Sequence, residues 1–169
     1  MEYNDIYDEN RRPAGRLHRR GTRWHKGEFG LVVCVWVYDG KGNLLLTRRA
    51  PQKSFAGTWE NSGGAAKAGE TSRQAIAREA YEELGVRIHQ DKFEKLAVYD
   101  NPGRIAAFRD GSIWRMVIVV YGLDLPEEPR MTISAESRDL RFFTKEELKD
   151  IEVVITHSDI VEDWFMNKE

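Results

Sequence analysis

Three things are scarce in this sequence: cysteine, long apolar runs and an excess of charge of either sign. The single cysteine, Cys34, excludes an internal disulfide and is typical of a reducing compartment. No apolar run reaches membrane-spanning length, and the acidic first residues lack the apolar stretch of a secretory signal. The formal net charge of -2 gives no general attraction to nucleic acid or to an anionic membrane. We therefore expect a cytoplasmic protein whose partners are neither membranes nor nucleic acid.

The composition that is present favours one folded domain preceded by an arm. The chain has 169 residues, 41% of them hydrophobic, which is enough for a substantial core. Residues 1–27 differ from the rest because they contain few apolar side chains and many basic ones. We divide the chain into an N-terminal arm, residues 1–27, and a main domain, residues 28–169.

The N-terminal arm has two interpretations. It could be a phosphate-contacting patch, since arginine forks match phosphate oxygens, or a solvated surface or dimer-forming arm. We expect a short strand over residues 2–8 and a turn over 12–15, with the arm packed on the main domain or across a homodimer. Its basic residues are Arg11, Arg12, Arg16, Arg19, Arg20, Arg23 and Lys26.

The main domain mixes strands and helices without regular alternation. Residues 29–38 are nearly all apolar, which predicts a strand buried on both faces, and residues 44–49 should return beside it as a hairpin. Further strands are expected at 93–99, 104–109, 112–125 and 140–143, with helices at 144–151 and 158–166. This order predicts an α+β domain in which helices flank a mixed sheet.

Residues 64–86, the box segment, contain the strongest local signals. Thr71 followed by Gln74 predicts a capped helix start, and Gly85 suits the left-handed position at the helix end. Three glutamates at i, i+3 and i+4 then share an arc of roughly 100° on that helix. These are Glu79, Glu82 and Glu83.

Carboxylates that lie this close disfavour one another's ionisation. A divalent cation such as Mg²⁺ or Mn²⁺ removes the conflict, because these ions prefer oxygen ligands. A bare acidic triplet is also compatible with a solvated helix face, so the surrounding glycines and their spacing decide between the two interpretations.

The box segment resembles the Nudix box, G-x5-E-x7-R-E-U-x-E-E-x-G-U, in which U is a bulky aliphatic residue. The one departure is Ala80 at the first U position, which concerns packing more than chemistry. The resemblance extends from about residue 28 to the C-terminus and implies an α/β/α sandwich. The matching positions are Gly64, Glu70, Arg78, Glu79, Glu82, Glu83, Gly85 and Val86.

The resemblance also implies an activity: metal-dependent hydrolysis of a diphosphate linkage in a small nucleotide derivative. Glu79 and Glu83 would bind Mg²⁺ or Mn²⁺, joined by the Gly64 carbonyl. Glu82 would bind a second ion, directly or through water. Arg78 and Glu70 would brace the loop against the helix.

The general base and the substrate stay open at this stage. The candidates for the base are Glu136, in the loop before a late strand, and the box residues Glu82 and Glu79. Four aromatic residues could stack on a base or belong to the core: Phe55, Trp59, Phe108 and Trp114. No substrate-binding residue is assigned.

Two alternatives come from other functional classes. The chain is also similar to isopentenyl-diphosphate isomerases at residues 17–19 and in segments between residues 35 and 61, but the cysteine and histidine that those enzymes need would fall at Gly64 and Ala66. A non-catalytic nucleotide-binding domain is the other alternative, and the retained Glu79, Glu82 and Glu83 argue against it.

Overall fold

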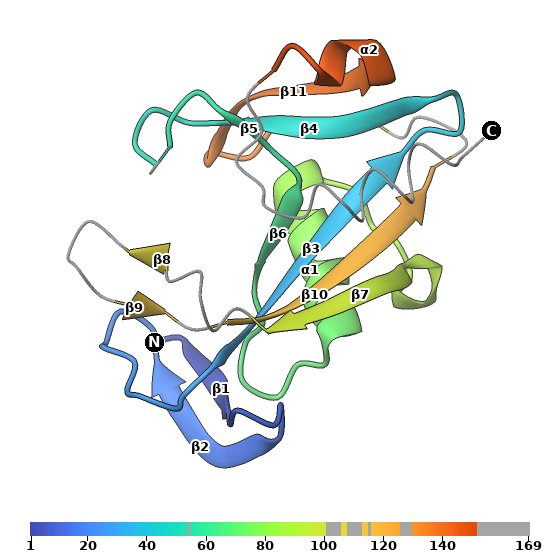
Figure 1. Ribbon diagram of the computed structural model, residues 1–169. Coiled ribbons are helices and arrows are strands. Elements are labelled where there is room, and N and C mark those ends of the chain that lie inside the picture. Colours follow the sequence, from blue (N-terminus) through green and yellow to red (C-terminus); the bar gives the residue numbers. More distant parts are fainter. Residues whose placement is uncertain (54, 101–105, 108–112, 115, 126–129, 152–169) are drawn as a thin grey trace.

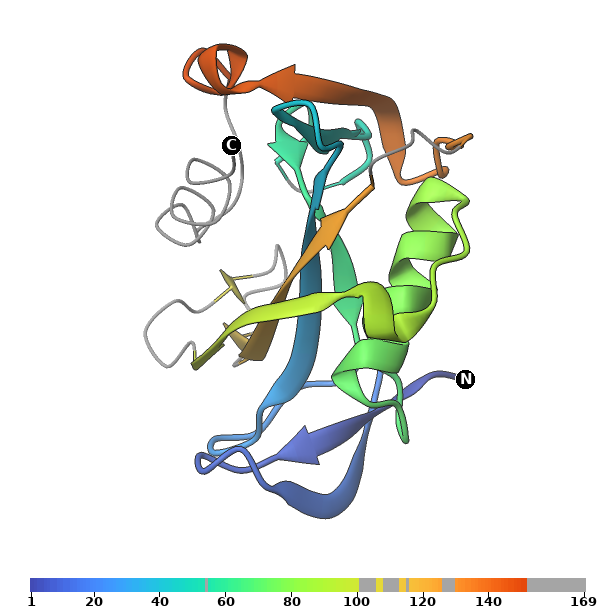
Figure 2. The same ribbon diagram turned by 90° about the vertical axis from the view of Figure 1, so that its right-hand side faces the viewer.

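The computed structural model describes residues 1–53, 55–100, 106–107, 113–114, 116–125 and 130–151. These residues form a mixed sheet, helix α1 (Ser72–Leu84) and a separate N-terminal hairpin (Figure 1). Figure 2 shows α1 against one face of the sheet. The expected α+β class is confirmed, while the last expected helix, residues 158–166, lies outside the described residues.

The main sheet is built around β3 (Gly30–Tyr38). This strand runs parallel to β10 (Met116–Asp124) and antiparallel to β6 (Ser62–Ala65). The strand order along the sheet is β11-β4-β3-β10-β7. The other strands on this path are β4 (Asn43–Arg49), β7 (Glu94–Asp100) and β11 (Ser137–Thr144), and their pairings are antiparallel, which gives the expected mixed sheet.

Strand β3 is buried on both faces, as its apolar run predicts. Alternate residues Val33, Val35 and Val37 belong to the core beneath α1. Cys34 and Trp36 point to a second cluster on the opposite face, with Tyr38, Leu44 and Phe143. Burial raises the pKa of the Cys34 thiol to about 11, so this cysteine is an unreactive core residue.

The expected hairpin between residues 29–38 and 44–49 is correct only at its closed end. β3 and β4 pair at Val37↔Leu45 and Tyr38↔Leu44 and then separate. Two short strands occupy the space between the separated β3 and β4, where we expected only a connecting segment. β5 (Trp59–Glu60) pairs with β4, and β6 pairs with β3. This divergence brings the start of the box segment into the sheet.

Helix α1 has the predicted caps. The Thr71 hydroxyl accepts the Gln74 N–H at 3.2 Å, and the Gln74 side chain accepts the Thr71 N–H at 2.9 Å. Gly85 ends the helix with φ 72°, in the left-handed region that favours glycine. The residues that α1 buries against the sheet are Ala75, Ile76, Ala80 and Leu84.

The remaining elements are short. A 3₁₀ turn, η1 (Gln90–Lys92), precedes β7. β8 (Ala106–Ala107) pairs with β9 (Ile113–Trp114), and the two lie within the strands expected at 104–109 and 112–125. The capping box at Thr144 opens α2 (Lys145–Leu148), which ends three residues before the predicted Ile151. None of the described helices is long and apolar enough to cross a membrane.

The N-terminal arm is itself a hairpin of β1 (Tyr3–Tyr7) and β2 (Pro13–Arg19). The expected turn at 12–15 is wrong, because the chain reverses at residues 8–12. The Asp8 carboxylate accepts the N–H groups of Asn10 and Arg12 at 2.8 and 2.9 Å, which closes the turn earlier and frees Pro13 to begin a strand.

Strand β1 is bound to the loop between β6 and α1. The Asn4 side chain donates to the Ala66 carbonyl at 2.7 Å, and the Tyr3 carbonyl accepts the Ala68 N–H at 2.8 Å. The Asp5 carboxylate accepts the Gly69 N–H at 2.8 Å. Three successive arm residues therefore hold the loop of the box segment, and the arm packs on its own main domain.

This docking predicts that Asn4→Ala destabilises the protein. The Asn4 side chain is buried, so its removal leaves the Ala66 carbonyl without that donor and should cost about 1–3 kcal/mol of unfolding free energy. Urea denaturation would measure the loss. The control is Asn10→Ala, at an exposed position of the same arm, and equal stability of the two variants would contradict the role of Asn4.

Candidate active site

The box segment begins where the backbone of β6 lies close to its neighbours. A Cβ at Gly63 would be 2.2 Å from the Val33 carbonyl oxygen, and one at Gly64 would be 2.5 Å from the carboxyl carbon of Glu79. The backbone contacts at Gly63 therefore require glycine, whereas a Cβ at Gly64 would force the Glu79 carboxylate to move. As a result, the Gly64 backbone lies directly against the side chain of Glu79.

Arg78 connects the loop to the helix. Its guanidinium donates to both carboxylate oxygens of Glu70 at 2.7 and 2.9 Å and to the Ala65 carbonyl at 3.1 Å. It also donates to Glu79 at 2.7 Å and to Glu82 at 3.1 Å. The pair with Glu70 raises the pKa of Arg78, so the guanidinium is a fixed positive charge at the centre of this network.

The three box glutamates differ in exposure and partners. The Glu79 side chain is 13% exposed, whereas that of Glu82 is 48% exposed and lies 3.8 Å from the Lys67 ammonium. Glu83 accepts the Gly63 N–H at 3.3 Å. Burial raises the pKa of Glu79, and the charges of Glu82 and Glu136 act in the same direction.

Glu83 has the most perturbed carboxyl group of the three. Burial raises its pKa to about 8, and the charges of Glu79 and Glu60 add to the rise. Glu60, at the end of β5, is paired with Arg49. In the absence of a cation, the pocket therefore favours the neutral form of Glu83 at neutral pH.

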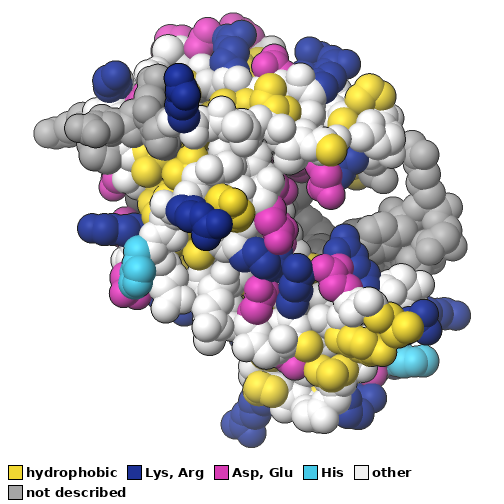
Figure 3. Space-filling model, turned by 180° about the vertical axis from the view of Figure 1, so that it is seen from behind, with side chains coloured by type: hydrophobic (Ala, Val, Ile, Leu, Met, Phe, Trp, Pro, Cys, Tyr) yellow, Lys and Arg dark blue, Asp and Glu magenta, His cyan; other side chains and the backbone are white. Residues whose placement is uncertain are grey.

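The carboxylates line a pocket of about 210 Å³. On the face seen in Figure 3, acidic and basic side chains are interspersed around a hollow. The structure brings most of the predicted site residues together here. Glu70 is not among the lining residues, but it binds Arg78, which is. The lining residues are Glu2, Asn4, Arg20, Lys53, Gly63, Gly64, Ala65, Lys67, Arg78, Glu79, Glu82, Glu83 and Glu136.

Glu136 reaches this pocket from the residue just before β11. Its carboxylate accepts the Lys53 ammonium at 2.6 Å, and its side chain is 61% exposed. The Lys53 ion pair lowers the pKa of Glu136, and the charge of Arg20 acts in the same direction. Glu136 is therefore an ionised and accessible carboxylate facing the box glutamates.

Sequence reasoning missed seven of the lining residues. Three belong to the box segment or the residue before it, Gly63, Ala65 and Lys67, and four come from elsewhere in the chain: Glu2, Asn4, Arg20 and Lys53. The basic composition of the arm is a signal for Arg20, but it does not distinguish Arg20 from the six other basic residues there. Among those seven basic residues, as far as the structure describes the lining, Arg20 alone contributes to the pocket wall.

The aromatic candidates do not line this pocket within the described residues. Trp59 packs edge-to-face on Phe143 with a ring separation of 4.6 Å and is partly buried against the second core cluster. Phe55 is 72% exposed with φ 55°. Phe108 lies outside the described residues, as does the side chain of Trp114.

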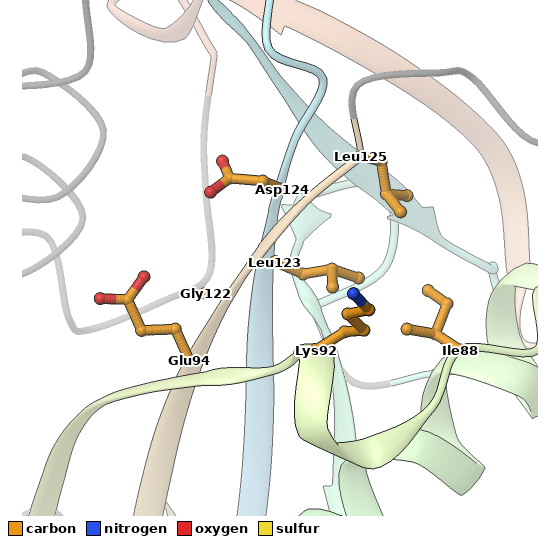
Figure 4. A pocket seen from close by; sticks show the side chains of 7 residues that line it. All are labelled: Ile88, Lys92, Glu94, Gly122, Leu123, Asp124 and Leu125. Atoms are coloured by element: carbon orange, nitrogen blue, oxygen red, sulfur yellow. The ribbon is translucent and has the colours of Figure 1, made fainter.

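A second cavity, of about 380 Å³, lies between η1, β7 and β10 (Figure 4). Its labelled side chains are apolar at Ile88, Leu123 and Leu125, with the Lys92 ammonium between them. The carboxylates of Glu94 and Asp124 point away from that ammonium. This cavity holds none of the predicted site residues.

The acidic pocket fits a hard divalent cation by its chemistry. Glu79 and Glu83 are buried carboxyl groups with raised pKa values, and the open Gly64 backbone lies beside them. A cation would relieve their repulsion. In the described part of the chain, however, no three acidic, His or Cys side chains already converge as ligands, because Arg78 holds Glu79 and Glu82.

Comparison with known proteins places the chain in a family. The NUDIX domain model matches residues 28–164. An uncharacterized Nudix hydrolase of Listeria monocytogenes is 33% identical over 172 residues, covering 99% of this chain and 93% of that protein. The chain therefore belongs to the Nudix hydrolase family, whose members act on pyrophosphate linkages. An isopentenyl-diphosphate isomerase of Klebsiella pneumoniae is 36% identical over 89 residues, covering 52% of this chain and 48% of that enzyme.

Solved structures confirm the Nudix fold. The protein DR0079 of Deinococcus radiodurans superposes with a TM-score of 0.70 at 24% identity, covering 96% of this chain and 98% of that chain. A bifunctional NMN adenylyltransferase/ADP ribose pyrophosphatase of Francisella tularensis, complexed with AMP and a manganese ion, has a TM-score of 0.64 at 16% identity. That match covers 88% of this chain and 43% of the other.

The raised pKa of Glu83 predicts a pH-dependent stability of the metal-free protein. Its pKa is about 8 in the folded state against an ordinary 4.5, so the folded state binds the extra proton between these values. Stability should therefore fall as the pH rises from about 5 to about 8. The side chain of Glu83→Gln stays neutral. The unfolding free energy of this variant should therefore rise relative to that of the wild type by up to about 1.4 kcal/mol for each pH unit in this range.

Urea denaturation in EDTA at several pH values would measure this gain. Glu146→Gln, at an exposed carboxylate of α2, is the matched control. A difference between Glu83→Gln and the wild type that does not change with pH would contradict the assignment.

Proposed function

We propose that this chain is a divalent-metal-dependent hydrolase that cleaves the diphosphate linkage of a nucleoside diphosphate derivative. The observation that supports it is the single pocket in which the Gly64 backbone, Glu79, Glu82 and Glu83 meet. Cations and carboxylates alternate around that pocket, which suits a polyanionic substrate bound together with metal ions.

Glu79, Glu83 and the Gly64 carbonyl would hold Mg²⁺ or Mn²⁺, and Glu82 would hold a second ion or its water. Such an ion, when bound, neutralises charge that develops on the diphosphate oxygens. Glu79 and Glu82 would give up their hydrogen bonds with Arg78 when they bind the metal. The pair of Arg78 with Glu70 would keep the loop and the helix in the same relative position during this exchange.

The general base that the geometry favours is Glu136. It is ionised and accessible, whereas Glu79 is buried under Arg78. Glu136 would take a proton from the attacking water as its oxygen bonds to phosphorus, and the bond from phosphorus to the leaving phosphate would break. Glu82, half exposed on the opposite wall, is the alternative base.

The other two functional classes have less support. Ala66 is buried at 4% exposure in the core, and Gly64 lies against Glu79, so neither position supplies the proton-transferring or metal-binding side chain of an isomerase. A binding domain without activity would not need three carboxylates with Glu136 across the pocket.

The first catalytic prediction concerns Glu83→Gln. This change keeps the shape of the side chain and removes a metal-binding charge, so turnover should fall by roughly a hundredfold or more. The measurement is Mg²⁺- or Mn²⁺-dependent phosphate release over a panel of nucleoside diphosphate derivatives. The exposed Glu146→Gln is again the control. Near wild-type turnover by Glu83→Gln would sink the ligand assignment, and isomerisation of isopentenyl diphosphate by the wild type would overturn the hydrolase proposal.

The second catalytic prediction separates the two candidate bases. Glu136→Gln should lower kcat by about 10²–10⁴-fold, the range for loss of a general base, while Mn²⁺ affinity stays unchanged. Glu82→Gln should weaken Mn²⁺ binding as well as turnover. Steady-state kinetics together with Mn²⁺ titration would measure both effects. If Glu136→Gln were fully active, Glu82 would become the favoured base.

A further inference from the structure

The N-terminal arm contributes directly to the wall of the acidic pocket. Its backbone is already fixed to the loop of the box segment through Tyr3, Asn4 and Asp5. The same hairpin brings Glu2, at its start, and Arg20, just after β2, to the pocket. The Arg20 N–H donates to the Glu2 carbonyl at 3.0 Å, so the two residues are held side by side.

Three cations in the wall of this pocket are used by no proposed catalytic step: Arg20, Lys53 and Lys67. Glu2 is ion-paired with the Arg20 guanidinium and lies 3.3 Å from the Lys67 ammonium. Lys53 is paired with Glu136. The charge of Arg20 also acts on Glu136 and lowers its pKa. These three cations therefore line the pocket together, which suits a phosphate ligand.

The pair between Arg20 and Glu2 is not needed to anchor the arm. Its two side chains are 69% and 37% exposed, and ion pairs this open to solvent contribute little to stability. A second ion pair of the arm is different, because it joins the arm to the main domain: Arg16 binds Glu28 at 2.9 Å, and the Glu28 side chain is only 6% exposed. The buried contacts therefore anchor the arm, and the Arg20 guanidinium can exchange Glu2 for another anion.

A phosphate group is a stronger partner for Arg20 than Glu2 is. Phosphate offers more charge and three acceptor oxygens, and it matches the guanidinium fork in two parallel hydrogen bonds. The described pocket wall contains no aromatic side chain, so it suits the phosphate part of a substrate more than a base.

We propose that Arg20 is a substrate-binding residue that takes a phosphate of the substrate, with Glu2 occupying its guanidinium until the phosphate replaces it. This inference rests on the proposed function, because it assigns a role in the same pocket. It makes the N-terminal arm a part of the active site that recognises the phosphate chain, in addition to its packing role.

The test is calorimetric titration of inorganic pyrophosphate with Mg²⁺ into the full-length protein. Arg20→Ala should bind pyrophosphate roughly tenfold more weakly, the scale of one charged hydrogen bond, and Arg20→Lys should recover part of the loss. Arg19→Ala, at the neighbouring exposed arginine, should bind like the wild type. Thermal unfolding of each variant would show whether the arm is still folded.

The decisive variant is Glu2→Gln. If Glu2 only occupies Arg20, removing its charge should leave pyrophosphate affinity equal or higher, which is the opposite of Arg20→Ala. If the pair is instead a structural anchor, both variants should lose affinity and stability together, and that result would overturn the proposal. Equal binding by Arg20→Ala and the wild type, or no pyrophosphate binding by the wild type, would also overturn it.

This measurement needs no turnover, so it separates the two proposals. Loss of pyrophosphate affinity in Arg20→Ala with no hydrolysis by the wild type would support the phosphate site and contradict the proposed hydrolysis. The opposite outcome is hydrolysis that is lost in Glu83→Gln together with a pyrophosphate affinity that Arg20→Ala does not change. That outcome would support the proposed reaction and contradict the role of Arg20.

Discussion

The candidate active site depends on the position of one guanidinium, that of Arg78. This half-buried group binds both oxygens of Glu70 and the Ala65 carbonyl, so it ties the loop of the box segment to α1. It also holds Glu79 and Glu82 in the absence of a cation. Buried carboxylates that repel one another need such a charge to be kept together. Without Arg78, the loop would lose its brace and the glutamates their common counter-charge.

The same loop is supported from its other side by the N-terminal arm. Asn4 and its neighbours bind residues 66–69, while Arg78 binds residues 65 and 70, so the loop is fixed along its whole length. A site that must hold several negative charges benefits from a backbone that cannot relax away from them. The arm therefore supports this loop from outside residues 28–164, where the family match lies.

Membership of the Nudix family fixes the class of reaction more firmly than the substrate. In the proposed function, the carboxylates and the open glycine backbone would supply a phosphate chemistry common to many substrates, and the fold alone does not choose among them. In this chain, the groups around that chemistry are polar and charged: Arg20, Lys53 and Lys67 on the rim, with Glu2 and Glu136 between them. Specificity would accordingly begin with the phosphate chain.

The sequence by itself determined the local features of this protein. The capped helix, its glycine end, the acidic triplet and the strand buried on both faces all depend on residues a few positions apart, so periodicity and capping chemistry predict them. Only the tertiary structure decided which distant groups share the pocket. β4 leaves β3 after two residue pairs and binds β11, which sets Glu136 beside Lys53, 83 residues away. Arg20 reaches the same pocket because β1 docks on the box loop. These placements follow from long-range strand pairing and buried hydrogen bonds, which no local pattern of residues encodes.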